Sequence, residues 1–106
     1  MRNAIYRIID VAQRETLPLM VMLAKVSEET GELSEATSVH AGYLPHKKMK
    51  EPLVGEVADV INTAIGVLVK AHPELNGGQI YDLLLESLNK KTDKWESVLQ
   101  TRTQVV

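Results

Sequence analysis

The segment from Pro52 to about Ala71 restricts the fold of this chain most, because so much of its circumference is apolar when it is drawn as a helix. Roughly half of that circumference or more is covered by Val57, Val60, Ile61, Ala64, Ile65, Val67, Leu68 and Val69. The remaining polar strip consists of Glu56, Asp59, Asn62, Thr63 and Lys70. A helix with this pattern is buried on more than one side. We therefore expect its polar strip to face a cleft, and a partner protomer to help cover its apolar face.

Proline and glycine residues divide the rest of the chain into three further stretches with helical spacing of apolar residues. Gly42 is expected to end the second stretch, and Asn76-Gly77-Gly78 is expected to form the turn before the last one. The three stretches run from Asn3 to Arg14, from Pro18 to about Ala41, and from Ile80 to Leu99. The sequence thus predicts an all-α fold, a compact four-helix protomer in a single domain over residues 1–106. We expect the tail from about residue 101 to be ordered only by a partner, if at all.

The composition narrows the class of protein. A chain of 106 residues that is 44% hydrophobic and 25% charged can form one small core, and oligomerisation would stabilise it. The net charge of −2 gives no basic surplus, so a nucleic-acid polymer is not an expected partner. The absence of cysteine excludes disulfides and thiolate metal sites, and it fits a reducing cytoplasm. Neither a signal peptide nor an apolar run of roughly 18 residues is visible, so we expect a cytoplasmic protein without a membrane partner.

Two acidic clusters lie within the apolar-periodic segments. They are Glu28-Glu29-Thr30-Gly31-Glu32 and Glu56-Val57-Ala58-Asp59. Carboxylates three residues apart on each of two facing helices can offer four oxygen ligands, which hard divalent cations such as Mg²⁺ prefer. Glu29 lies at the edge of the apolar stripe, seven residues from both Met22 and Ala36, and so points toward the bundle. Two acidic pairs so placed would repel each other unless a cation neutralised them. This pattern predicts a Mg²⁺ site.

A lysine interrupts the apolar line of the last predicted helix. Lys91 comes seven residues after Leu84 and seven before Val98, with Lys94 one step round the helix. An ammonium group at such a position either extends to solvent along its aliphatic stem or meets an anionic partner.

The two acidic clusters together resemble the EExxE…ExxD signature of MazG-like all-α nucleoside triphosphate pyrophosphohydrolases. The segment from Lys25 to Leu33 carries the first half, and Glu56-Val57-Ala58-Asp59-Val60 carries the second, with 23 residues between Glu32 and Glu56. The resemblance covers the second to fourth predicted helices. It implies hydrolysis of (deoxy)nucleoside triphosphates to the monophosphate and pyrophosphate, a housecleaning role in the nucleotide pool, and assembly as a homodimer or homotetramer.

The same resemblance implies roles for individual residues. The Mg²⁺ ligands would be Glu29, Glu32, Glu56 and Asp59, and Mn²⁺ is a possible substitute metal. Glu28 would be an outer-shell group or would orient water, and Glu29 or Glu32 would act as the general base. Members of the family also use an asparagine followed by basic residues to hold phosphates, which suggests Asn89, Lys91 and Lys94. Because Thr92 and Asp93 interrupt the basic run and Asn89 turns away from Lys91, we favour the two lysines for substrate binding.

Two other interpretations remain open from the sequence, and a third does not fit it. A phosphoribosyl-ATP pyrophosphohydrolase would share the metal ligands and differ in its substrate. A di-iron carboxylate bundle would need Glu-x-x-His pairs, which this chain lacks. A non-catalytic helical interaction module would carry its acids as ordinary surface residues and would not be stabilised by Mg²⁺.

Overall fold

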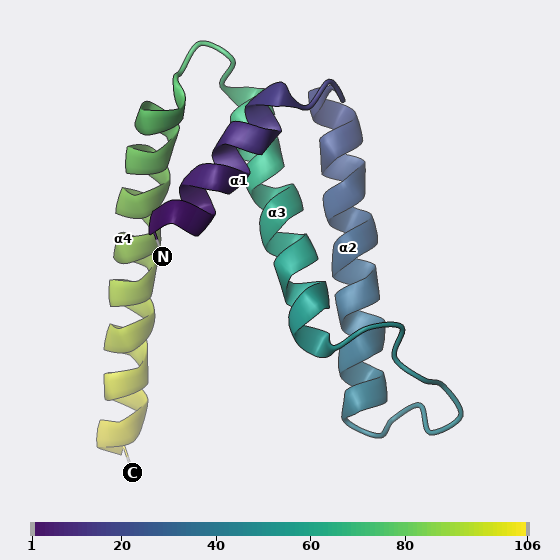
Figure 1. Ribbon diagram of the computed structural model, residues 1–106. Helices are drawn as coiled ribbons and strands as arrows, with labels where there is room; N and C mark the ends of the chain where they lie inside the picture. The colour runs from purple at the N-terminus through teal and green to yellow at the C-terminus, as the bar shows by residue number, and fades with distance from the viewer. Residues whose placement is uncertain (1, 106) are drawn as a thin grey trace.

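The computed structural model describes residues 2–105, and helices are its regular elements. They are α1 (Arg2–Arg14), α2 (Leu19–His40), α3 (Leu53–Ala71) and α4 (Gly77–Val105). Helices α2 and α3 form an antiparallel hairpin (Figure 1). Helix α1 crosses the C-terminal half of α3, and α4 packs chiefly against α1. No strand occurs in residues 2–105, so the all-α prediction with four helices is confirmed. None of the described helices combines the length and the apolarity that crossing a membrane requires.

The end of α2 is set by Gly42, as predicted. Gly42 has a φ of 85°, a left-handed conformation that glycine adopts without steric cost. Its N–H donates to the carbonyl of Val39 at 3.1 Å, and the N–H of Tyr43 donates to the carbonyl of Ser38 at 2.9 Å. This pair of hydrogen bonds is a Schellman motif, which satisfies carbonyl groups at the end of the helix. The chain then enters the loop that leads to α3.

The start of α4 differs from the prediction because of an unrecognised cap. The Asn76 Oδ1 accepts a hydrogen bond from the N–H of Gln79 at 2.9 Å, and the Gln79 Oε1 accepts one from the N–H of Asn76 at 2.9 Å. This reciprocal capping box begins the helix at Gly77, so both glycines that were predicted to form a turn lie in its first turn. The predicted limits of this helix, Ile80 and Leu99, were both wrong: the helix begins three residues earlier and ends six residues later. The helix continues to Val105, through the segment from residue 101 that was expected to need a partner.

Replacing Asn76 with alanine should remove this cap. Loss of an N-cap hydrogen bond costs about 1 kcal/mol of stability. The free energy of unfolding measured in urea should fall by that amount, and the urea concentration at the midpoint should fall with it. The exposed Gln100 on the same helix is the matched control, since Gln100→Ala removes a similar side chain without a capping role. Both variants should be compared with the parent at one protein concentration, because self-association also shifts the midpoint. Equal midpoints for Asn76→Ala and the parent would contradict the capping role.

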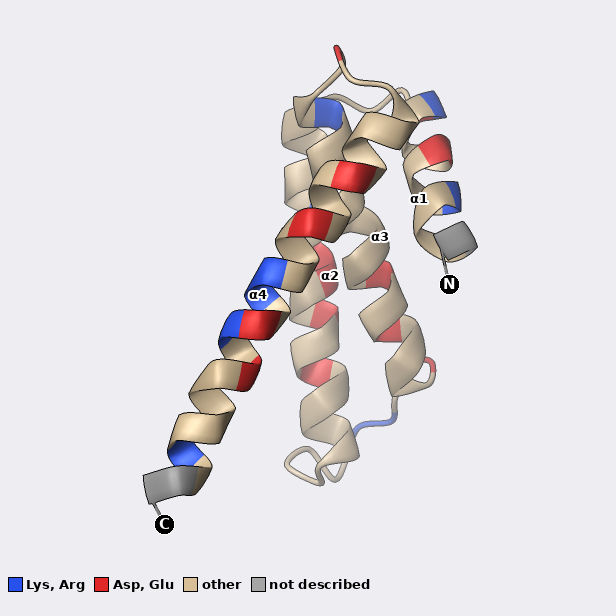
Figure 2. Cartoon of the chain, turned by 90° about the vertical axis from the view of Figure 1, so that its left-hand side faces the viewer, with Lys and Arg blue, Asp and Glu red and all other residues tan. Residues whose placement is uncertain are grey.

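The hydrophobic core is small and lies where three helices meet. Ile9 of α1 and Ile80 of α4 are the largest fully buried side chains, and Ala12, Ile65 and Val69 pack with them. The core therefore joins α1, the C-terminal half of α3 and the first turns of α4. The remainder of α4 extends away from the α2–α3 hairpin (Figures 1 and 2).

The protomer is extended, which corrects the prediction of a compact one. Its accessible surface is 7985 Å², whereas a compact monomer of this mass exposes about 5,900 Å². Its radius of gyration is 16.7 Å, against about 13 Å for a compact domain of this length. Part of the excess is apolar: Val57 and Ile61 of α3 are 40% and 47% exposed, and Trp95 of α4 is 68% exposed. One chain thus leaves uncovered much of the apolar face that the sequence marked on α3.

Candidate metal centre

The carboxylates from the two predicted acidic clusters meet between α2 and α3. The hairpin sets the acidic parts of the two helices side by side (Figure 2). One oxygen from each of Glu29, Glu32 and Glu56 lies within 4.8 Å of the other two. A second group with the same spacing consists of Glu51, Glu56 and Asp59. All four predicted metal ligands therefore belong to two overlapping triads that share Glu56.

Glu56 is the most buried charged residue of this centre. It is 6% exposed, and its Oε2 finds no hydrogen-bond partner within residues 2–105. Its place in the first turn of α3 suits a negative charge, because the N-terminal end of a helix dipole is positive. That dipole does not replace the lost hydration of a buried carboxylate, which is costly to leave unpaired. A divalent cation between α2 and α3 would supply the missing counter-charge.

Negative charge is crowded at two further positions. Partial burial raises the pKa of Glu29 above its ordinary value, and the carboxylates of Glu32, Asp59 and Glu28 raise it further. Partial burial also raises the pKa of Glu51, and the charges of Glu56 and Asp59 add to this effect. Like Glu56, Glu29 has an Oε2 that is buried and lacks a hydrogen-bond partner among the described residues. The centre thus favours a bound cation or, without one, a bound proton.

Glu51, which belongs to the second triad, is not among the predicted metal ligands. It lies in the loop before α3, a segment that reads as a polar connection between helices. The available signal was the position of Gly55, four residues after Glu51 and next to Glu56. Glycine has no Cβ, so at this position it leaves space for another group to approach the backbone of the helix.

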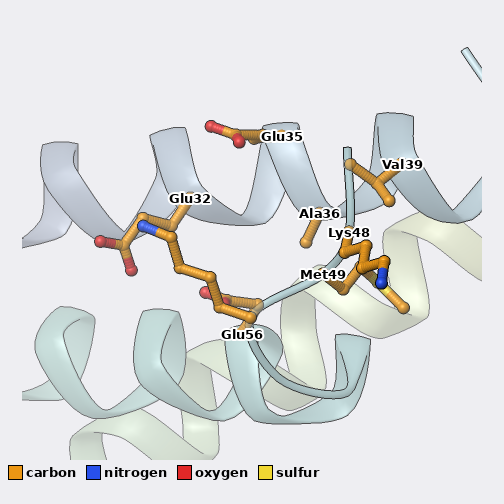
Figure 3. A pocket seen from close by; sticks show the side chains of 8 residues that line it. Glu32, Glu35, Ala36, Val39, Lys48, Met49 and Glu56 are labelled. Carbon is orange, nitrogen blue, oxygen red and sulfur yellow. The ribbon is translucent and has the colours of Figure 1, made fainter. Parts of the chain in front are cut away.

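A small cavity adjoins the carboxylates. Its volume is about 30 Å³, enough for a water molecule or an ion but far too small for a nucleotide. Glu32 and Glu56 project into the space between the facing helices, whereas Glu35 points away from it (Figure 3). The cavity is lined by Glu32, Glu35, Ala36, Val39, Lys48, Met49, Lys50 and Glu56. The α2–α3 loop thus contributes two lysines, Lys48 and Lys50, to the lining of this cavity, and neither was predicted to have a role.

A larger groove lies one helical turn along the hairpin. Its volume is about 580 Å³, within the range of small-molecule sites. Lys25 precedes Glu29 by four residues and Asn62 follows Asp59 by three, so the groove begins beside the acidic centre. It is lined by Ala4, Arg7, Ile8, Val11, Ala12, Glu15, Met22, Lys25, Asn62, Thr63 and Gly66. This mixture of apolar, amide and cationic groups suits a heterocyclic ligand.

The other predicted site residues lie outside the two triads. Glu28 is exposed on α2, where its charge acts on Glu29. Asn89, Lys91 and Lys94 are exposed on the part of α4 that runs away from the hairpin (Figures 1 and 2). A single protomer therefore does not bring the predicted phosphate-binding residues to the carboxylates.

The chain matches no family model, and it has no significant match among curated proteins or among solved structures.

Proposed function

We propose that this protein is a Mg²⁺-dependent nucleoside triphosphate pyrophosphohydrolase, which cleaves (deoxy)nucleoside triphosphates to the monophosphate and pyrophosphate. The observation that carries the proposal is the convergence of carboxylates from α2, α3 and their loop around the buried, unpartnered oxygen of Glu56. Such a set of hard oxygen donors suits Mg²⁺, which proteins commonly use with phosphate substrates. The reaction itself is inferred from the resemblance of the two acidic clusters to the MazG-like signature.

Mg²⁺ would be held by Glu29, Glu32, Glu56 and Asp59, with Mn²⁺ as a substitute. When bound, the metal would offset the negative charge of the phosphates and make water easier to deprotonate. The residues fit this role because oxygens of Glu29, Glu32 and Glu56 lie within 4.8 Å of one another, and an oxygen of Asp59 lies within the same distance of one of Glu56.

The side chains around the metal have distinct tasks in this proposal. Glu29 or Glu32 accepts the proton of the attacking water, since both carboxylates lie at the place where the metal would hold that water. The water oxygen bonds to the α-phosphorus, and the bond from that phosphorus to the bridging oxygen breaks. Pyrophosphate leaves with the electron pair. Lys48 and Lys50, which line the cavity beside the carboxylates, stabilise its charge.

The larger groove would receive the nucleoside. Its apolar residues, such as Ile8 and Val11, would contact the base, and the amide of Asn62 would hydrogen-bond to its edge. The proximity of Lys25 and Asn62 to the acidic centre supports this orientation, because the phosphates would then extend toward the metal.

The active unit in this proposal is a homodimer or homotetramer. The extended shape and the exposed apolar residues of α3 and α4 support self-association. Lys91 and Lys94, which lie away from the carboxylates of their own chain, would then contact substrate bound to another protomer.

The proposal is tested by measuring pyrophosphate release from canonical and modified ribo- and deoxyribonucleoside triphosphates, with and without Mg²⁺. We expect release of pyrophosphate and monophosphate in equal amounts, only when the metal is present. Phosphoribosyl-ATP belongs in the same panel, because turnover of that compound alone would assign the related reaction instead. If folded protein with Mg²⁺ releases no pyrophosphate from any of these compounds, the proposed function is wrong.

A further inference from the structure

Glu51 is a carboxylate outside the two acidic clusters of the sequence, yet it lies with them in space. One of its oxygens is within 4.8 Å of oxygens of both Glu56 and Asp59. It reaches this position from the loop, at the residue that precedes Pro52 and the start of α3. Its placement therefore depends on the path of the α2–α3 loop and not on the helical spacing of the other ligands.

The backbone of α3 leaves space for the Glu51 carboxylate at Gly55. A Cβ atom added to Gly55 would lie 2.7 Å from Oε2 of Glu51 and 2.9 Å from its Cδ, closer than such atoms approach in real structures. The side chain of Glu51 thus occupies the space that any other residue at position 55 would fill. Because the clash would involve the end of a flexible side chain, alanine at position 55 would move the carboxylate without disrupting the helix.

A second feature indicates that this group of acids has a ligand. Glu56, which belongs to both triads, is more than nine-tenths buried, and its Oε2 has no hydrogen-bond partner within residues 2–105. None of the described side chains places an ammonium or guanidinium group within hydrogen-bond distance of that oxygen. A cation bound between Glu56 and its neighbours would satisfy it.

We propose that Glu51 is a fifth metal ligand and that it creates a second cation position with Glu56 and Asp59. Its carboxylate has this place because Gly55 lacks a side chain that would fill the same space. Glu56 then bridges this position and the one formed with Glu29 and Glu32. The inference rests on the metal site of the proposed function and extends it by one residue of this chain. Two cations that share a bridging carboxylate can act on one phosphate from two sides, as in two-metal phosphoryl-transfer sites.

The inference is tested by titrating the protein with Mn²⁺ and measuring unbound Mn²⁺ by electron paramagnetic resonance. The parent should bind two ions per chain, while Glu51→Gln and Gly55→Ala should each weaken the second ion by roughly 10-fold to 100-fold. Gly31→Ala is the matched control, since a Cβ there meets no atom within 4 Å and the residue also lies in a helix beside a predicted ligand. Glu74→Gln, which alters an exposed loop acid, controls for the loss of charge. Circular dichroism verifies that each variant remains helical.

The double variant Glu51→Gln/Gly55→Ala separates positioning from a general effect on the fold. If Gly55 acts only through Glu51, the double variant should bind Mn²⁺ as weakly as either single variant and no more weakly. Two ions bound with parental affinity in Glu51→Gln or Gly55→Ala would overturn the inference, as would a parent that binds one ion or none. If Mn²⁺ binds as predicted but no pyrophosphate is released from any substrate, this inference stands and the proposed reaction is refuted.

Discussion

Replacement of Glu56 with glutamine is expected to lower Mg²⁺-dependent pyrophosphate release by at least about 100-fold, the upper end of what loss of an outer-shell partner costs a metal site. Glu56 is shared by both triads, so this one change removes a ligand from each. The same substitution should stabilise the metal-free protein by about 1–3 kcal/mol, because it removes a buried and unpaired negative charge. The new amide group can also donate hydrogen bonds to the carboxylates that surround it. Activity and stability should therefore change in opposite directions.

Thermal unfolding with and without Mg²⁺ measures the predicted change in the stability of Glu56→Gln. The parent should gain stability with Mg²⁺ by mass action, and Glu56→Gln should gain little. Glu74→Gln is the control for loss of a carboxylate: Glu74 is exposed in the loop between α3 and α4, lies outside both triads, and pairs with His72 at 3.4 Å. This control should retain both activity and the response to Mg²⁺. A Glu56→Gln protein that turns over substrate at the parental rate, or that unfolds at a lower temperature without metal, would contradict the assignment.

The parts of the fold that sequence analysis predicted well depend on local signals. Apolar periodicity defined the hairpin of α2 and α3, and Gly42 marked the end of α2 because a left-handed residue is needed there. The spacing of Glu29, Glu32, Glu56 and Asp59 placed four carboxylates on facing surfaces once those two helices were paired. Each inference needed only helical geometry and one pairing of neighbouring helices.

The features that sequence analysis missed depend on interactions across several residues. The capping box of Asn76 and Gln79 overrode the tendency of two glycines to form a turn, so the limits of α4 were misjudged. Glu51 reaches the centre through a loop whose path has no periodic pattern. The direction of α4 is likewise set by its packing against α1, so the spacing of its lysines gave no information on their distance from the carboxylates.

Charge substitution on the exposed face of α4 should separate the protein into single chains. Leu88, Trp95 and Leu99 recur at helical spacing and are 45%, 68% and 49% exposed, so they form an apolar stripe that one chain leaves uncovered. The protomer exposes about 2,000 Å² more surface than a compact monomer of its mass, which is enough for the interface of an obligate homodimer. We therefore expect the parent to sediment as a dimer or a larger homo-oligomer at micromolar concentration.

The variant Trp95→Glu/Leu99→Glu should sediment as a monomer. In a twofold-symmetric interface each substitution occurs twice, so a loss of about 2 kcal/mol for each buried Trp95 alone would weaken dimerisation by roughly a thousandfold. Gln100→Glu adds the same charge to an exposed polar position of α4 and should leave the assembly intact. Analytical ultracentrifugation across a range of concentrations measures both. A monomeric parent, or a double variant of unchanged mass, would refute the interface.

The same variant distinguishes the contributions of the two groups of lysines to catalysis. The carboxylates of one chain meet within the α2–α3 hairpin, so a monomeric variant should still bind Mn²⁺. Lys48 and Lys50 also remain beside those carboxylates, whereas Lys91 and Lys94 lie on α4, away from them in the same chain, and would have to come from a second protomer. Loss of turnover with retained Mn²⁺ binding would therefore indicate that substrate is held between protomers. Retained turnover in the monomer would instead assign phosphate binding to the α2–α3 loop of the same chain.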